Sequence, residues 1–211
     1  MKRAPLVVLV AVLLSLLAAA ALRSATRSSP GTATGQAAAN TGPAATRAAP
    51  APARLAALRA AAALDPCPTS ISPELPDVVL PCLGGGPPVH LRGAGSGVPT
   101  LVNVYGSWCG PCQSEMPTLA AFANEAGKRV RLVGVDTEDD PTQALPFAHD
   151  FGQHWPAVVD DDKVVLLRYG AGPPLTLFLD GRGHVVFVQR GAFRDLAAVR
   201  TAVAQHLGVR V

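Results

Sequence analysis

Two cysteines separated by two residues are the strongest chemical signal in the 211-residue chain: Cys109 and Cys112, within the string WCGPC. They follow an apolar run, Thr100–Tyr105, and open a segment with helical character. A thiol at a helix N-terminus faces unpaired backbone N–H groups and the positive end of the helix dipole, which favour its thiolate. A second thiol three residues later lies on the same helix face, about 5–6 Å away at Cβ. This spacing lets a disulfide form with little backbone motion.

The pattern also predicts different roles for the two thiols. We expect Cys109 to be the exposed nucleophile and Cys112 to be the more buried, resolving thiol. Pro111 is tolerated between them because the N–H groups of the first helical turn have no partner within the helix. The predicted chemistry is therefore exchange between thiols and disulfides.

Apolar runs and helical segments around this pair predict an α/β domain at residues 65–211. The predicted strands are Asp77–Leu80, Val89–Leu91, Thr100–Tyr105, Val130–Val135, Ala157–Val159, Thr176–Leu179 and Val185–Gln189. The predicted helices are Pro111–Glu125, Pro141–Phe151, Lys163–Tyr169 and Arg194–Leu207. This order predicts a mixed central β-sheet flanked by helices.

The N-terminal residues differ from this domain in composition. Residues 4–22 are uncharged and follow Lys2 and Arg3; as a helix they would span about 28 Å, close to the roughly 30 Å of a bilayer core. Residues 1–22 are therefore predicted to be a signal anchor that places the domain outside the cytoplasm. The small residues 19–21 keep a cleaved signal peptide, and hence a secreted protein, as the alternative.

Residues 23–64 are predicted to be a flexible linker. They are mostly Ala, Thr, Ser, Gly and Pro, a composition that buries too little apolar surface to offset the entropy lost on ordering. Residues 53–64 contain strong helix formers, but a helix of this length is too short to be stable alone.

The charge distribution argues against a nucleic-acid partner. The chain has 18 basic and 15 acidic residues, a formal net charge of +3. All 15 acids lie in residues 65–211, which carry a net charge of −4 with their 11 basic residues. A nucleic-acid-binding domain needs a basic patch on the domain itself.

Cys67 and Cys82 flank a proline-rich stretch near the start of the predicted domain. An even number of cysteines in an exported chain favours pairing, so we expect a structural Cys67–Cys82 disulfide. Closing a loop of about 15 residues would contribute roughly 3 kcal/mol. Free thiols, or a second redox pair that relays electrons to Cys109 and Cys112, are the alternatives. A four-cysteine zinc site is disfavoured because Cys67 and Cys82 lack the short ligand spacing, and we predict no metal or other cofactor.

The residues around WCGPC resemble a known family. WCGPC after an apolar strand resembles the thioredoxin superfamily, and LVNVYGSWCGPCQSEMP at residues 101–117 more narrowly resembles the exported TlpA/ResA-type thiol–disulfide oxidoreductases. Asn103, Glu115 and Pro117 are shared with that group. The resemblance covers residues 76–211. It implies a thioredoxin-like fold with a TlpA-type N-terminal hairpin and an inserted strand–helix segment near residues 130–170.

The resemblance also implies roles for individual residues. Cys109 would attack a substrate disulfide and Cys112 would release the mixed disulfide. Pro174 would be the cis-proline that faces the pair and helps to bind an extended substrate. Pro173 has no N–H for substrate backbone, which removes one hydrogen bond worth about 1 kcal/mol, unless a register shift exchanges the roles of the two prolines. The residues expected to support the active site are Trp108, Gly110, Pro111, Pro174, Asn103 and Glu115.

The active-site acid is less well defined by the resemblance. Asn103 stands where thioredoxin carries a buried acid, and in the TlpA/ResA group an acid from the inserted segment can serve instead. Glu138 and Asp139 are the candidates, although residues 136–140 fit a solvated turn equally well. Glu115 fits both a marker of the group and an ordinary acid in the first helical turn.

These features predict an extracytoplasmic enzyme that reduces disulfides in exported proteins, because the Gly-Pro dipeptide resembles that of reducing thioredoxin. The resemblance implies apocytochrome c thiols or a copper-site assembly factor as substrates, and a membrane or extracytoplasmic thiol as electron donor. The alternatives are a disulfide oxidant or isomerase for secreted proteins, and a thiol-based copper carrier. A peroxiredoxin-type peroxidase is disfavoured because Gly106, not threonine, lies three residues before Cys109.

Overall fold

The computed structural model describes residues 51–170 and 172–211. The predicted signal anchor at residues 1–22 and the linker residues 23–50 lie outside the described residues. Within the described ranges, no helix is both long and apolar enough to cross a membrane.

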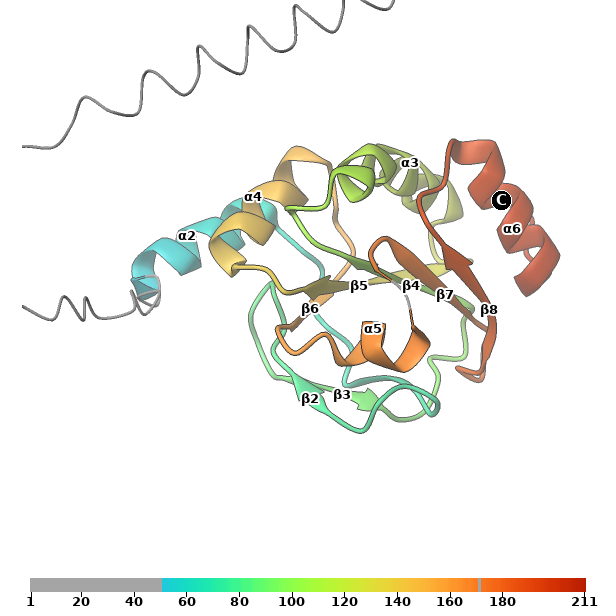
Figure 1. Ribbon diagram of the computed structural model, residues 1–211, viewed down its shortest axis with the longest axis horizontal. Helices are drawn as coiled ribbons and strands as arrows, with labels where there is room; N and C mark the ends of the chain where they lie inside the picture. Colours follow the sequence, from blue (N-terminus) through green and yellow to red (C-terminus); the bar gives the residue numbers. More distant parts are fainter. Residues whose placement is uncertain (1–50, 171) are drawn as a thin grey trace, which may run out of the picture. The chain divides into compact units, whose positions relative to one another are not determined.

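A central mixed sheet of five strands positions the rest of the domain. Its strands are β4 (Thr100–Tyr105), β5 (Arg131–Thr137), β6 (Ala157–Asp160), β7 (Leu175–Leu179) and β8 (Val185–Arg190). They are ordered β6-β5-β4-β7-β8; β4, β5 and β6 run parallel, and β7 and β8 complete the sheet with antiparallel pairing (Figure 1). Strands β4 and β7 are buried along their whole length, which agrees with their largely apolar sequences.

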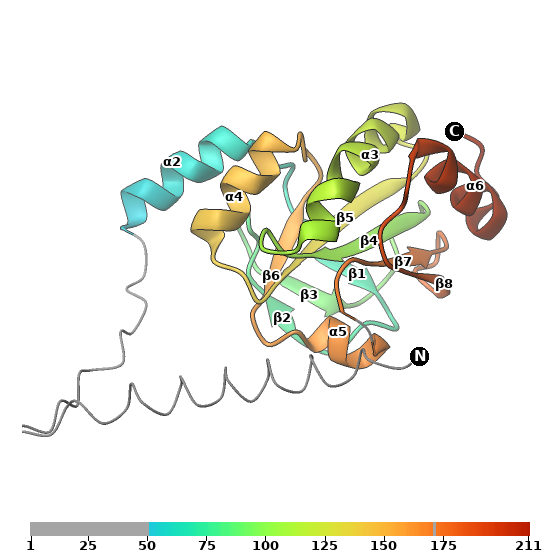
Figure 2. The same ribbon diagram turned by 45° about the horizontal axis from the view of Figure 1, so that its top comes forward.

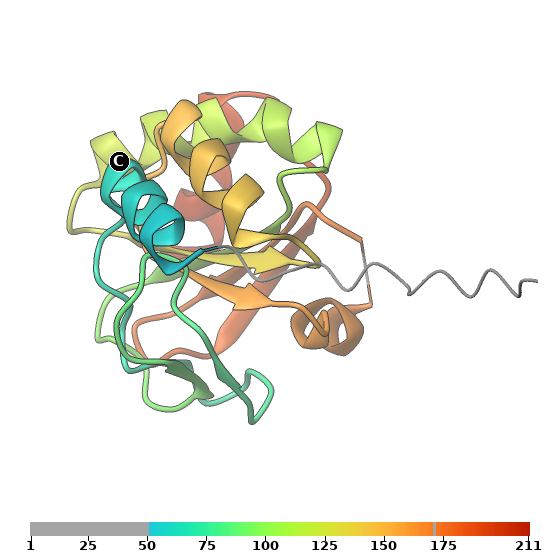
Figure 3. The same cartoon turned by 90° about the vertical axis from the view of Figure 1, so that its left-hand side faces the viewer.

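A small sheet and a short helix cover one face of the central sheet (Figures 1 and 3). The small sheet contains β1 (Ser70–Ser72), β2 (Val79–Leu80) and β3 (Val89–Arg92), and the helix is α5 (Val164–Tyr169). Strands β2 and β3 form the expected antiparallel hairpin, and β1 pairs in parallel with β3. Strand β1 was not expected from the sequence, because its three residues are too few to show a period.

Three helices cover the opposite face of the central sheet (Figure 2): α3 (Gly110–Ala126), α4 (Pro141–Asp150) and α6 (Leu196–Leu207). Phe122 and Val203 pack with Phe178 of β7 in this half of the core. The Asp195 side chain caps α6 by accepting the N–H of Ala198. The predicted mixed sheet flanked by helices, with α4, β6 and α5 inserted between β5 and β7, is thus confirmed.

A further helix, α2 (Pro52–Ala62), differs from the sequence-based expectation. It lies within residues 23–64, which were expected to form a flexible linker, and it packs against α4 (Figures 1 and 3). Leu55 and Leu58 contact a core cluster that contains Leu145 of α4. A helix of this length is unstable alone, but burial of its apolar side supplies the stabilisation that propensity lacks.

The structure contains the expected Cys67–Cys82 disulfide, with 6.0 Å between the two Cα atoms. Cys82 is 4% exposed, and it pairs with Val158 of β6 in an antiparallel bridge. Cys67 packs against the core cluster between the central and small sheets. The Cys67–Cys82 disulfide therefore joins the segment ahead of β1 to the outer edge of the central sheet.

Candidate active site

Cys109 and Cys112 lie where β4 passes into α3, after the loop 106–108. Cys109 is the N-cap residue of α3, and its sulfur accepts the backbone N–H of Cys112 at 3.2 Å. The two residues form a disulfide with a Cα–Cα distance of 5.2 Å. The geometry therefore places Cys109 at the positive end of a 17-residue helix, where a thiolate is stabilised once the bond is reduced.

Both cysteines are buried in this disulfide form. Cys109 is 5% exposed and Cys112 is fully buried. Cys109 is the more exposed of the two, which agrees with its expected role as the reactive thiol. The expectation that Cys109 is an exposed residue is wrong, because it is buried. The reason is packing: both side chains belong to the core cluster that contains Met116 and Phe122 of α3.

Hydrogen bonds from neighbouring elements help to hold the loop 106–108. The Trp108 indole N–H donates to the carbonyl of Thr137 at the end of β5, at 3.2 Å. The Gln113 side chain donates to the carbonyl of Ser107 at 2.8 Å. Trp108 is nevertheless 54% exposed, so an apolar surface stands beside the disulfide. Gly106 is required, since a Cβ there would approach the Trp108 Nε1 atom to 2.5 Å.

The peptide bond between Pro173 and Pro174 is cis, so Pro174 occupies the cis-proline position and the two prolines do not exchange roles. Leu175 of β7 pairs with Val104 of β4, which places Pro174 at the same end of the sheet as the cysteine loop. The carbonyl of Pro174 accepts the N–H of Gly191 at 3.0 Å. Pro174 therefore directly precedes β7, beside the strand β4 that leads to the cysteines.

Glu115 lies one helical turn after Cys112 and is only 1% exposed. Its carboxyl oxygens accept the backbone N–H of Phe193 at 3.0 Å and the side-chain amide of Asn103 at 3.4 Å. The same amide of Asn103 donates to the Thr176 hydroxyl at 3.0 Å. Burial raises the pKa of Glu115 to about 7, and the two hydrogen bonds partly oppose that shift. The first turn of α3 contains no acid, because the helix begins at Gly110, so the interpretation of Glu115 as an ordinary first-turn acid is wrong.

The two acids suggested for the inserted segment have different surroundings. Glu138 forms an ion pair with Lys163 at 2.9 Å, and its side chain is 41% exposed. Asp139 accepts the backbone N–H of Ser107, two residues before Cys109. The structure therefore brings Asp139 to the cysteine loop and directs Glu138 to Lys163.

The interpretation of residues 136–140 as a solvated turn is wrong at its start. Asp136 and Thr137 are the last residues of β5 and both are fully buried. Asp136 was not predicted as a site residue, because the predicted strand Val130–Val135 stops before it. The signal that could have identified Asp136 is its position: it directly continues the apolar run of a strand that is expected to be buried.

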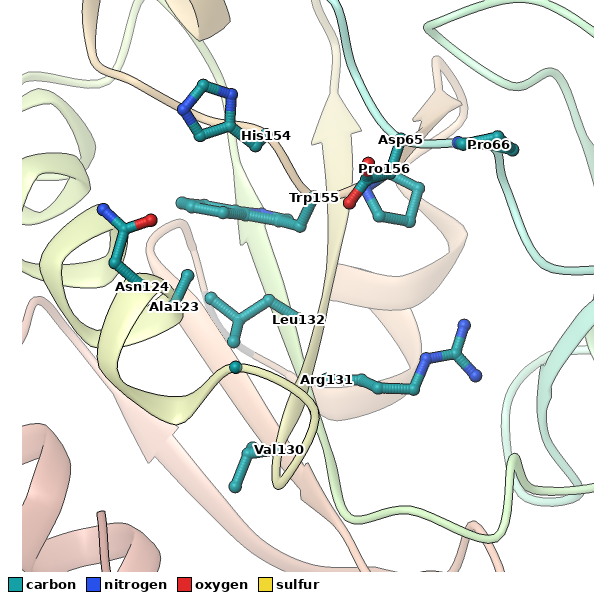
Figure 4. Close-up of a pocket in the computed structure, with 11 residues that line it drawn as sticks. Asp65, Pro66, Ala123, Asn124, Val130, Arg131, Leu132, His154, Trp155 and Pro156 are labelled. Atoms are coloured by element: carbon teal, nitrogen blue, oxygen red, sulfur yellow. The ribbon is translucent and has the colours of Figure 1, made fainter.

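A cavity of about 410 Å³ lies beside the C-terminal part of α3, away from the helix end that carries the cysteines (Figure 4). Its walls include Asn124, Leu132 and Trp155, and none of the site residues predicted from the sequence lines it. Among residues 51–170 and 172–211, no group of three or more His, Cys, Asp or Glu side chains could hold a metal ion.

A cysteine pair at the start of a helix, with a cis-proline at the same end of a mixed sheet, is typical of the thioredoxin superfamily. More narrowly, the chain belongs to the Redoxin family, whose profile matches residues 72–205.

Two curated relatives show where the similarity lies. The chain is 37% identical over 102 residues to the thiol:disulfide interchange protein DsbE of Xylella fastidiosa, covering 47% of this chain and 51% of that protein. It is 31% identical over 140 residues to the thiol-disulfide oxidoreductase ResA of Geobacillus thermodenitrificans, covering 65% of this chain and 76% of that protein. The match thus spans only about half the length of the DsbE relative.

Solved structures share the fold at lower sequence identity. MTB DsbF has a TM-score of 0.53 and 24% identity, covering 62% of this chain and 98% of that chain. A putative thiol:disulfide interchange protein DsbE from Chlorobium tepidum has a TM-score of 0.52 and 23% identity, covering 68% of this chain and 95% of that chain. Both comparisons support the thioredoxin-like architecture described above.

Proposed function

We propose that the protein is an extracytoplasmic thiol–disulfide oxidoreductase that reduces disulfides in exported proteins through Cys109 and Cys112. The observation that carries the proposal is the disulfide between these residues at the N-terminus of α3, with Cys109 as N-cap. The relatives named thiol:disulfide interchange protein and thiol-disulfide oxidoreductase support the same activity.

In the proposed reaction the reduced dithiol supplies two electrons to the substrate. The Cys109 thiolate attacks one sulfur of the substrate disulfide; the substrate S–S bond breaks, a mixed disulfide forms and one substrate thiolate leaves. The Cys112 thiolate then attacks the Cys109 sulfur and releases the second substrate thiolate. The enzyme ends in the Cys109–Cys112 disulfide form, which is the form described above. The two protons of the dithiol balance the two thiolates released.

Glu115 is the proposed proton acceptor for the second step. Cys112 is fully buried, so its proton needs an acceptor inside the protein. Glu115 follows Cys112 by three residues on α3, and its pKa of about 7 is suited to accept and return a proton near neutral pH. Asn103 and the backbone of Phe193 hold the Glu115 carboxyl in place. Trp108 and Pro174 are the proposed contacts for substrate on either side of Cys109.

An extracytoplasmic location is supported by the second disulfide. Cys67–Cys82 joins residues outside the proposed active site, and such structural bridges persist in oxidising compartments. The proposed partners are exported proteins with disulfides, apocytochrome c among them, and a membrane or extracytoplasmic thiol donor that reduces Cys109–Cys112 again. The proposed membrane attachment is through residues 1–22.

Trapping of intermediates tests the cysteine roles. In the full-length protein, Cys112→Ser should accumulate mixed disulfides with exported proteins through Cys109, and Cys109→Ser should form none. Adducts that form equally well in Cys109→Ser would contradict the assignment of the nucleophile.

The direction of electron flow follows from the reduction potential of Cys109–Cys112, measured by equilibration with glutathione. A reductase should have a potential near or below about −230 mV. A potential of about −120 to −180 mV would instead identify an oxidant or isomerase.

A further inference from the structure

Ser107, two residues before Cys109, is held at both of its backbone polar groups by side chains of other segments. Its N–H donates to a carboxyl oxygen of Asp139, which lies in the loop between β5 and α4. Its carbonyl accepts the side-chain amide of Gln113, near the start of α3, at 2.8 Å. The reaction proposed above assigns no role to Asp139 or Gln113, although both contact the turn that leads to Cys109.

Ser107 and Trp108 form the centre of the turn that carries the chain from β4 into α3. The N–H of Cys109 donates to the carbonyl of Gly106 at 3.1 Å, which closes this turn. The backbone angles of the two central residues set the direction in which the chain leaves a turn. The two contacts to Ser107 therefore help to fix the place where Cys109 enters α3.

Gln113 ties this turn to the helix on the other side of the cysteine pair. Its backbone N–H donates to the carbonyl of Cys109 at 3.0 Å, at the start of α3. Its side chain reaches back past the pair to the carbonyl of Ser107. Gln113 is exposed, so water would satisfy its amide and burial does not require this contact. The contact therefore constrains the cysteine loop without adding to the core.

Asp139 holds the N–H of Ser107 from a segment that is itself fixed. The other carboxyl oxygen of Asp139 accepts the N–H of Asp140 at 2.8 Å. Asp140 in turn caps α4 by accepting the N–H of Thr142 at 2.8 Å. Ser107 is thus clamped between the start of α3 and the start of α4.

The reactivity of Cys109 depends on the position of its sulfur at the start of α3. The sulfur accepts the N–H of Cys112 at 3.2 Å in the disulfide form. The stabilisation that a helix N-terminus gives to an anion falls off within the first turn. A turn that shifts relative to α3 therefore leaves less of Cys109 as the thiolate, which is the form that attacks a disulfide.

We propose that Gln113 is a positioning residue of the active site: with Asp139 it clamps Ser107 and thereby holds Cys109 against the N–H groups at the start of α3. This inference deepens the proposed function and rests on it in taking Cys109 as the attacking thiol. It is independent of the direction of electron flow and of the identity of the substrate.

Alkylation of Cys109 by iodoacetamide at pH 7 measures its reactivity without any protein substrate. In full-length Cys112→Ser with Cys67–Cys82 oxidised, Cys109 is the one free thiol, because the chain has four cysteines. Addition of Gln113→Met should lower the alkylation rate constant about threefold to tenfold, as for the loss of one hydrogen bond. Met favours a helix as Gln does and has no N–H donor, so the change removes the contact to Ser107 with little change in size.

Two further variants separate the clamp from a general effect on helices. Gln143→Met makes the same change near the start of α4, where Gln143 is exposed, and it should leave the alkylation rate unchanged. Asp139→Ala removes the other contact to Ser107. Because both side chains hold one residue, Gln113→Met should have a smaller effect in the Asp139→Ala background than without it. The direct effect of the Asp139 charge on Cys109 cancels in this comparison.

Turnover completes the test, since Gln113→Met in the protein with both active-site cysteines should lower kcat/KM for a disulfide substrate by the same factor as alkylation. An alkylation rate that Gln113→Met leaves unchanged would overturn the inference. So would an effect of Gln113→Met that is equal with and without Asp139→Ala, or one that Gln143→Met shares. The expected alkylation results, combined with no turnover of a protein disulfide by wild type, would support the inference and contradict the proposed function.

Discussion

Substitution of Glu115 by Gln should make the stability of the protein less dependent on pH. In the folded protein burial raises the pKa of Glu115 from 4.5 to about 7. The folded state therefore binds this proton more tightly than the unfolded state does. The contribution of Glu115 to stability is therefore fully present below about pH 4.5 and is lost as the pH rises through about 7. A shift of this size corresponds to about 3 kcal/mol, because one pKa unit is worth about 1.4 kcal/mol.

The difference in unfolding free energy between Glu115→Gln and wild type isolates this contribution. Gln has the same shape and carries no charge, so any cost of its amide facing Asn103 is the same at every pH. Between pH 4 and pH 8 the difference should therefore move by about 3 kcal/mol in favour of Glu115→Gln. Contributions from other groups, Asp136 included, are present in both proteins and cancel.

Denaturant titrations of the disulfide form at pH 4, 5, 6, 7 and 8 measure this difference. The matched control is Glu125→Gln, on the same helix, where Glu125 pairs with Arg200 and its side chain is 37% exposed. A surface ion pair is worth at most about 1 kcal/mol, so the control should change little at any pH. A difference for Glu115→Gln that stays constant from pH 4 to pH 8 would refute the reasoning, since the carboxyl would then be equally solvated in both states.

Three further substitutions test the structural framework. Replacing Cys67 and Cys82 together by Ser should lower the unfolding free energy by roughly 3 kcal/mol in denaturant titrations and leave the Cys109–Cys112 potential unchanged; an unchanged midpoint would show that the bridge does not stabilise the fold. Gly106→Ala should displace Trp108, seen as a change in its fluorescence, and reduce kcat/KM; a variant with wild-type fluorescence and turnover would show that the loop tolerates a Cβ. Leu58→Asp should detach α2 from α4 and increase amide exchange throughout α2, whereas protection equal to wild type would mean that the contact does not hold the helix.

The sequence was most informative where chemistry is local. The WCGPC string predicts a thiol pair at a helix N-terminus because helix geometry alone brings residues three apart to one face. The resemblance to the TlpA/ResA group implies a cis-proline at Pro174, and the Pro173–Pro174 peptide bond is cis in the structure. The strands and helices of residues 130–170 were also predicted, since their apolar runs follow ordinary periodicity, and the resemblance implied that they form an inserted segment.

The sequence was least informative where burial comes from distant residues. Glu115 is held by Phe193, which is 78 residues away in the chain, so no local pattern could show that its carboxyl is buried. Asp136 resembled the start of an acidic turn, because the strands beside it, β4 and β6, are distant in the sequence. The stability of helix α2 was underestimated for the same reason, since it depends on contacts with α4, which is distant in the sequence.

The segment 81–83, which carries Cys82, covers the outer edge of β6. Strand β6 is the last strand on its side of the central sheet, and an open strand edge can recruit strands from other chains. Here Leu83 donates its N–H to Ala157 at 2.8 Å, and Val159 donates its N–H to Pro81 at 2.9 Å. Cys82 lies between these two contacts and anchors the segment through its bond to Cys67. Reduction of the Cys67–Cys82 disulfide would release the segment 81–83 and expose the edge of β6. A protein proposed to exchange disulfides with its substrates therefore needs this second disulfide to stay oxidised.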